Sequence, residues 1–230
     1  MGSLSLLQIT DFLGSVTLFR GMGRDALLHF AEVTREKRYP KGNVIVFADD
    51  PGDSLFIVRA GRVKVVLLGD DGREVILGVL GVGEHFGELA LIDDQPRSAH
   101  VIAVEDSILL VLRREDFRKR VESSPSVAWA LLTELSRRLR EADHKIGGLV
   151  LLDVPGRIAR VLLENAPDET TNLVQKRLTH QMIAQMVGAS RETVSRTLGD
   201  FQDANWISVE RRMIRLTDRE ALRRRAAIKV

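Results

Sequence analysis

The sequence predicts an α+β fold in which a β-rich first part is followed by a long helix and a helical last part. Short apolar runs rich in β-branched residues lie between residues 44 and 112, separated by turn residues. Apolar residues then recur every three or four positions from Ala128 to Leu149, which is the spacing of one helix face. Near the C-terminus, two helix-like segments flank the short turn Gly188-Ala189-Ser190. These patterns predict two domains joined by a long helix.

The first part is expected to be a sandwich or barrel, because many short strands at close spacing favour those architectures. The strand-like runs cover residues 44–47, 55–58, 63–67, 75–77, 100–104 and 107–112. Residues 4–20 are apolar without a regular period and are expected to be irregular. Residues 24–33 and 115–121 are each expected to form a short helix.

The long helix is predicted to begin at Ser124-Pro125 and to end near residue 152. Its apolar face has the narrow spacing of a coiled-coil seam and favours a dimer interface, although such a seam also suits packing on its own domain. The predicted interface residues are Leu132, Leu135, Leu139, Ala142, Ile146 and Leu149. Asp153, Pro155 and Gly156 suit a joint and a new helix start. The predicted domains are therefore 1–122, the helix and hinge 123–153, and 154–230.

The composition and the distribution of charge along the chain exclude some classes of protein and favour others. Residues 154–230 carry 14 Lys and Arg against 9 Asp and Glu, whereas the residues before them carry 20 against 23. An acidic first part joined to a basic second part points weakly to a sensor attached to a polyanion-binding domain. The chain has no cysteine, which excludes disulfides and thiolate metal sites. Without a long apolar run or a signal-like start, it is expected to be cytoplasmic, with no membrane partner.

Residues 86–99 have the chemistry of a nucleotide pocket. Gly87 permits close approach of the backbone, and Leu89 and Ala90 are expected to start a short helical turn whose N–H groups suit an anion. Arg97 can grip a phosphate through two parallel hydrogen bonds, and Ser98 adds a hydroxyl. Glu88 suits a ribose hydroxyl. The apolar residues expected to be buried around them are Phe86, Leu89, Leu91 and Ile92.

The order F-G-E-L-A followed by P-R-S-A resembles the phosphate-binding cassette of cyclic-nucleotide-binding domains. It is similar to those of the CRP/FNR family of bacterial transcription regulators and of eukaryotic cyclic-nucleotide-dependent kinases. The resemblance implies a jelly-roll-like β-roll and a homodimer that forms through the long helix. It also implies that the allosteric ligand is a cyclic nucleotide, with cyclic AMP as the first candidate. A cassette that is kept for folding and has lost its ligand is the alternative.

Residues 178–203 predict a helix-turn-helix. Thr179 can cap a helix through Val187, and Ser190 can cap a second helix, with Gly188 in a left-handed conformation between them. On the second helix Arg191, Glu192 and residues 195 and 196 lie away from the apolar face. Arg can bind guanine and Glu can accept from cytosine N4 in the major groove. An exposed polar face with no partner is the alternative interpretation.

V-G-A-S-R-E-T-V-S-R closely resembles the recognition motif of CRP-type regulators. This resemblance implies a TGTGA-like half-site in double-stranded DNA, a winged hairpin over residues 206–209 and 213–216, and RNA polymerase as a partner if the protein activates. The residues expected to contact DNA are Thr179, Gln181, Ser190, Arg191, Glu192, Ser195 and Arg196. Residues 219–225 are expected to form a basic helix.

One departure from cyclic-AMP-responsive members concerns the base. The two adjacent hydroxyl or amide residues that contact adenine in those members align here with Ala142 and Asp143. Ala142 offers no side-chain hydrogen bond, and Asp143 is an acceptor that suits the adenine amino group or the two donors of guanine. Cyclic GMP or a cyclic dinucleotide is therefore an open alternative to cyclic AMP.

Two other functions are compatible with part of these patterns. Constitutive DNA binding and a regulatory subunit acting through protein contacts are rivals to the ligand-switched regulator. The five histidines have no metal-ligand spacing, so no metal site is expected. No nucleophile elbow or Walker loop occurs, so no enzymatic activity is expected.

Overall fold

The computed structural model describes residues 5–174, 178–210 and 213–227. The chain forms two compact units, Met1–Leu139 and Arg140–Val230. The division falls inside the long helix α5 (Pro125–Leu151), within the segment 123–153 that was predicted to join the two domains. The reason is that Val127 and Leu131, in the first turns of α5, are buried, and Leu131 belongs to the core of the first unit.

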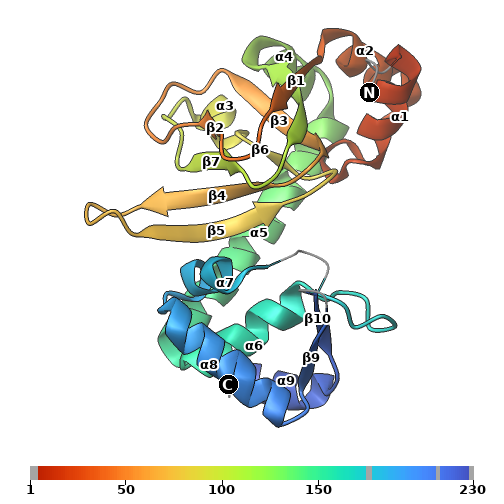
Figure 1. Ribbon diagram of the computed structural model, residues 1–230. Helices are drawn as coiled ribbons and strands as arrows, with labels where there is room; N and C mark the ends of the chain where they lie inside the picture. Colours follow the sequence, from red (N-terminus) through yellow and green to blue (C-terminus); the bar gives the residue numbers. More distant parts are fainter. Residues whose placement is uncertain (1–4, 175–177, 211–212, 228–230) are drawn as a thin grey trace. The chain divides into compact units, whose positions relative to one another are not determined.

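The first unit contains two four-stranded sheets, in the orders β1-β8-β3-β6 and β2-β7-β4-β5, and every strand pair is antiparallel (Figure 1). The strands are β1 (Arg35–Tyr39), β2 (Val44–Val46), β3 (Ser54–Ala60), β4 (Val63–Leu68), β5 (Glu74–Leu80), β6 (His85–Phe86), β7 (His100–Ala103) and β8 (Ser107–Arg113). The predicted α+β class with an N-terminal β domain is confirmed.

Four elements of this unit were not predicted. Strand β1 was not predicted, because its sequence Arg-Glu-Lys-Arg-Tyr has no apolar alternation and only one edge is paired, with β8. Strand β6 has only two residues. The segment expected to be irregular forms helix α1 (Leu6–Ser15) and a 3-10 turn (Thr17–Phe19). Ser5 and Gln8 cap α1 reciprocally, a capping box that the prediction overlooked.

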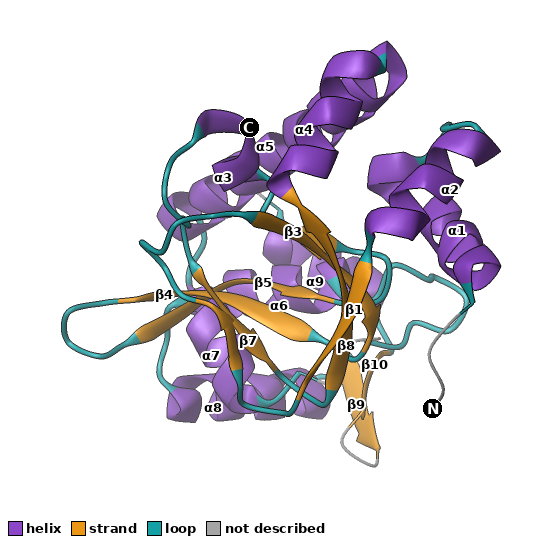
Figure 2. Cartoon of the chain, turned by 90° about the horizontal axis from the view of Figure 1, so that it is seen from above, coloured by secondary structure: helices purple, strands orange, loops and turns teal. Residues whose placement is uncertain are grey.

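Two apolar clusters stabilise the unit. One joins α1, α2 (Arg24–Val33), α4 (Arg114–Ser123) and α5 to strands β3 and β8, and includes Phe19, Phe30 and Phe117. The other lies between strands and includes Phe56 and Phe86, whose rings stack with centroids 5.0 Å apart. Figure 2 shows α1 and α2 together beside β1. The strands adjoining the cassette are thus fixed by buried apolar packing.

The second unit is helical with one hairpin. Its elements are α6 (Val154–Glu164), α7 (His180–Val187), α8 (Arg191–Asp203), β9 (Ile207–Glu210), β10 (Met213–Leu216) and α9 (Arg219–Ala226). Helix α6 packs against α7, α8 and α9 around buried Ile158 and Leu162. Asp153 caps α6, because its Oδ1 accepts the Gly156 N–H at 3.0 Å. The predicted helices, hairpin and terminal basic helix are all present.

Among the described residues, no helix combines the length and apolar character needed to cross a membrane.

Candidate functional site

The cassette begins at Gly87, between β6 and the short helix α3 (Leu89–Asp93). Gly87 has φ +90°, and a Cβ placed on it would lie 2.5 Å from Arg97 Nη1 and 2.9 Å from the Ser54 carbonyl oxygen. Glycine is therefore required here for both conformation and space. The predicted helical turn after the glycine is confirmed, and Phe86 and Leu91 are buried as expected. Leu89 and Ile92 were expected to be buried but are more than 40% exposed, because a single-sided turn of five residues presents them to solvent.

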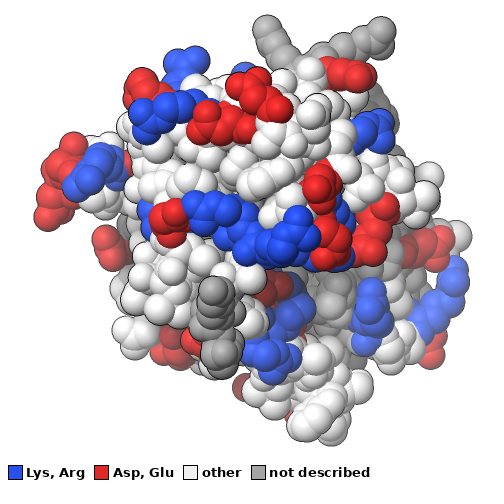
Figure 3. All heavy atoms as spheres, turned by 90° about the horizontal axis from the view of Figure 1, so that it is seen from below, with Lys and Arg blue, Asp and Glu red and all other residues white. Residues whose placement is uncertain are grey.

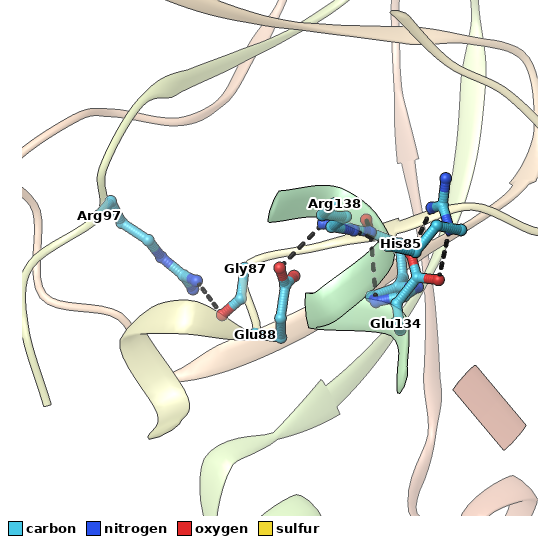
Figure 4. Close-up of polar contacts among 7 residues, drawn as sticks. His85, Gly87, Glu88, Arg97, Glu134 and Arg138 are labelled. Atoms are coloured by element: carbon cyan, nitrogen blue, oxygen red, sulfur yellow. Dashed lines mark hydrogen bonds and ion pairs between the residues drawn. The ribbon is translucent and has the colours of Figure 1, made fainter. Parts of the chain in front are cut away.

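Arg97 is almost fully buried beneath this turn. Its Nη1 donates to the Gly87 carbonyl at 2.8 Å (Figure 4), and its Nη2 donates to the Ser54 carbonyl at 2.8 Å. The guanidinium carbon also lies 5.7 Å from the centre of the Phe56 ring. Burial lowers the pKa of Arg97, and the charge of Asp53 opposes that change. Arg97 thus braces the cassette backbone and keeps a positive charge beneath it, while Ser98 is exposed.

Helix α3 is fixed at its far end by two arginines that the sequence analysis did not single out. Arg118 Nε donates to the Leu91 carbonyl at 2.6 Å, and Arg114 Nη2 donates to the Ala90 carbonyl at 2.9 Å. Both also pair with Asp94, which ends the helix in a left-handed conformation. Cationic side chains at a helix C-terminus donate hydrogen bonds to the last carbonyls and interact favourably with the helix dipole.

Glu88 is 2% exposed, and its two carboxylate oxygens have different surroundings. Oε1 accepts from Arg138 Nη1 at 2.8 Å, whereas Oε2 is buried and has no hydrogen-bond partner among the residues that the structure describes. Burial raises the pKa of the Glu88 carboxyl, and the charge of Arg138 opposes the rise. An acceptor buried without a donor is costly, so Oε2 is suited to a donor brought by a ligand.

Arg138 is not among the residues predicted for the site, yet it is central to it. Besides Glu88, its Nε donates to Glu134 Oε1 at 2.9 Å, and its Nη2 lies 2.7 Å from the His85 carbonyl oxygen and 3.2 Å from His85 Nε2 (Figure 4). Glu134 also accepts from Arg137. Burial would raise the pKa of Glu134, but hydrogen bonds from Arg137 and Arg138 outweigh it and hold that pKa at about 2. The cluster joins the cassette to α5 through the buried carboxylates of Glu88 and Glu134.

The remaining predicted ligand residues, Ala142 and Asp143, lie on α5 in the second unit and are exposed. The predicted dimer residues Leu132, Leu139, Ile146 and Leu149 are each more than half exposed. Leu135 differs from them, because it is half-buried against the core of the first unit. Trp129, which the sequence analysis left out of the seam, is 72% exposed.

The predicted helix-turn-helix is present in the second unit. Thr179 Oγ1 accepts the Met182 N–H and Ser190 Oγ accepts the Thr193 N–H, each at 3.1 Å. Gly188 joins the helices with φ 64° and ψ 47°. Val194, Leu198 and Phe201 are buried. The polar residues predicted to contact DNA are exposed, namely Thr179, Gln181, Ser190, Arg191, Glu192, Ser195 and Arg196.

Side chains around the recognition helix α8 add one contact that was not predicted. His180 Nδ1 lies 2.8 Å from Ser195 Oγ, which ties the start of α7 to the exposed side of α8. Figure 3 shows basic and acidic side chains interspersed on the face it presents. An exposed polar face on the second helix of a helix-turn-helix suits entry into the major groove of DNA.

Comparisons with known proteins agree with both halves of this description. The cyclic nucleotide-binding domain family matches residues 36–124, and the Crp-like helix-turn-helix domain family matches residues 156–225. The CRP-like cAMP-activated global transcriptional regulator of Mycobacterium tuberculosis is 34% identical over 221 residues, which cover 94% of this chain and 99% of that one. The chain belongs to the CRP/FNR family of transcription regulators.

Two further family members are similar over most of their length. The cyclic AMP receptor protein of Thermus thermophilus is 38% identical over 79% of this chain and 83% of its own. The structure of the c-di-GMP responsive global regulator CLP of Xanthomonas campestris superposes with a TM-score of 0.71 and 27% identity, covering 84% of this chain and 99% of that one. This CRP/FNR protein is thus a DNA-binding regulator with a cyclic nucleotide-binding domain, and its relatives are regulators rather than enzymes.

Proposed function

We propose that the protein is a homodimeric transcription regulator that binds cyclic AMP in the cassette and, when it is bound, binds a palindrome with TGTGA-like half-sites. The observation that carries the ligand proposal is the buried Glu88 Oε2, an acceptor without a donor, near the buried cation Arg97. A ribose hydroxyl supplies that donor, and the N–H groups of the α3 turn supply donors for a cyclic phosphate. The cAMP-activated relatives favour the same ligand.

The exposed apolar face of α5 supports a homodimer. Leu132, Leu139, Ile146 and Leu149 recur at helical spacing, and each is more than half exposed in the described part of the chain. Such a stripe on a soluble protein marks an interaction surface, and a second copy of the same helix complements its spacing. A two-fold dimer presents two α8 helices, so the operator is expected to be a pseudo-palindrome with half-sites about one DNA turn apart.

Two observations favour rival forms of the same regulator. Arg97 and Arg138 already donate to acceptors inside the protein, which suits a constitutive regulator that needs no ligand. The similarity to a c-di-GMP responsive regulator favours a cyclic dinucleotide. In the second case the ligand would prevent DNA binding instead of promoting it.

DNA binding is expected to depend on cyclic AMP and on Arg196. Fluorescence anisotropy with a TGTGA-containing palindrome should show tighter binding when cyclic AMP is added, and two chains per duplex. Arg196→Ala should weaken binding to the palindrome by about 10- to 100-fold, because a bidentate contact to guanine is lost.

Arg224→Ala is the matched control, because it removes an exposed arginine of the same unit from α9. It should change affinity for the palindrome and for a random duplex alike. If Arg196→Ala also weakens both duplexes equally, Arg196 does not select a base. DNA binding that is equally tight with and without cyclic AMP would support the constitutive form.

The preference for the base is expected to depend on Asp143. In Asp143→Ala the ratio of cyclic GMP to cyclic AMP affinity should shift by roughly 10-fold or more, because a hydrogen bond to an ionised acceptor is removed. Calorimetry of both nucleotides on wild type and variant measures the ratio, with Glu141→Ala, an exposed carboxylate on the same helix, as the control. An unchanged ratio in Asp143→Ala excludes this residue from base choice.

A further inference from the structure

The guanidinium of Arg138 is held by an unusual number of acceptors. Glu134 Oε1, Glu88 Oε1 and the His85 carbonyl oxygen accept from Nε, Nη1 and Nη2 at 2.9, 2.8 and 2.7 Å. A fourth atom, His85 Nε2, lies 3.2 Å from Nη2. Both contacts of Nη2 thus come from one residue, His85, which is 2% exposed.

The contact between Arg138 and His85 Nε2 defines the tautomer and the charge of the imidazole. A guanidinium has only donors, so Nε2 must accept and the ring hydrogen must be on Nδ1. The imidazole is therefore neutral. Burial and the positive charge of Arg138 lower the pKa of His85 to about 3, so the neutral form persists throughout the physiological range.

Two acceptors on Nη2 fix the plane of the guanidinium and not only its position. The backbone carbonyl of residue 85 is present whatever the side chain, and it accepts only one of the two Nη2 hydrogens. The imidazole takes the other. With the plane fixed, Nη1 points at Glu88 Oε1, and Glu88 Oε2 is left as the acceptor without a donor. Without the imidazole, one Nη2 hydrogen loses its acceptor, and the guanidinium is expected to turn so that it shares both oxygens of Glu88.

We propose that His85 is a positioning residue for nucleotide binding, which holds Arg138 so that Glu88 presents one oxygen to the ribose hydroxyl. The inference rests on the proposed binding of a cyclic nucleotide. An apolar residue at position 85 would fill the buried space but leave an Nη2 hydrogen unsatisfied. Glutamine would fill it and carry an acceptor at about the reach of Nε2.

The test compares His85→Met and His85→Gln with wild type by calorimetry of the full-length protein. Cyclic AMP and 2′-deoxy cyclic AMP are the two ligands. His85→Met should bind cyclic AMP about 10-fold more weakly than wild type, the effect of one hydrogen bond to a charged group, and His85→Gln should bind within about threefold of wild type. Affinity for the 2′-deoxy nucleotide should be the same in all three proteins, because it lacks the hydroxyl that Glu88 accepts.

His100→Met is the matched control, because His100 is a second imidazole of the same unit whose Nδ1 accepts the Ala48 N–H at 3.2 Å. It should leave the ratio of the two affinities unchanged. Equal affinity of wild type and His85→Met for cyclic AMP, or an equal loss for both nucleotides, overturns the positioning role. Absence of cyclic AMP binding in wild type overturns the proposed function itself, which is a different result.

Discussion

Arg138→Met is expected to lower the free energy of unfolding of the first unit by about 3–5 kcal/mol at neutral pH. The substitution leaves Glu88 and Glu134 buried, at 2% and 3% exposure, without the cation that each shares. Breaking a buried ion pair on one side costs more than the pair contributes, because the remaining charge has lost its water. Hydrogen exchange of the amides of β3 and β8 measures the loss within this unit.

Arg137→Met is the matched control for Arg138→Met. Its side chain is 48% exposed, and its ion pair with Glu134 is therefore expected to contribute about 1 kcal/mol or less. Adding Glu88→Gln to Arg138→Met should restore part of the stability. If Arg137→Met and Arg138→Met cost the same, the buried cluster is not what stabilises this end of α5.

The cost of Arg138→Met should also shrink in acid. The pKa of Glu134 is lowered to about 2 in the folded protein, so its stabilising effect is present above its ordinary pKa of 4.5 and is lost as the pH falls toward 2. The difference in stability between wild type and Arg138→Met should follow the same course. A difference that stays constant from pH 5 to pH 2 would contradict the role given to Glu134.

Gly87→Ala is expected to weaken cyclic nucleotide binding by about 100-fold, which is the loss of roughly 3 kcal/mol of interactions at the cassette. The new Cβ would lie 2.5 Å from Arg97 Nη1 and 2.9 Å from the Ser54 oxygen, and must displace the guanidinium or the turn. The positive φ adds a conformational cost of about 1–2 kcal/mol to stability. Calorimetry with cyclic AMP measures the affinity.

Gly83→Ala separates the two effects at Gly87. Gly83 has φ +83°, close to the +90° of Gly87, but a Cβ there meets nothing within 4 Å. It should share the conformational cost and bind the nucleotide within about threefold of wild type. Equal affinity of the two alanine variants would show that the close approach of Arg97 to Gly87 does not matter for binding.

Much of the fold could be predicted because its elements carry local signals. The strands with runs of β-branched residues and the helices capped by Thr179 and Ser190 were recognised from their own sequence. Strand β1 could not be, because its charged residues pair with β8, which is more than 60 residues away. The capping box at Ser5 was a local signal that was missed.

The site could be predicted only in part, because some of its contacts join residues that are far apart in the sequence. Gly87, Glu88 and Arg97 lie within eleven residues of one another and form a local motif. Arg138 is 50 residues from Glu88 and 53 from His85, and only the packing of α5 against the first unit brings them together. Nothing near position 138 distinguishes it from the other arginines of the helix, so its role required the structure.

The most direct test of the account is calorimetric titration of the wild-type protein with cyclic AMP and with 2′-deoxy cyclic AMP, alongside Arg97→Ala. We expect saturable binding of cyclic AMP, binding of the 2′-deoxy nucleotide weaker by about 10-fold or more because it has no hydroxyl to donate to Glu88 Oε2, and no binding to Arg97→Ala. Equal affinity for the two nucleotides would contradict the role of Glu88. Absence of binding to wild type, with DNA still bound, would contradict ligand control altogether.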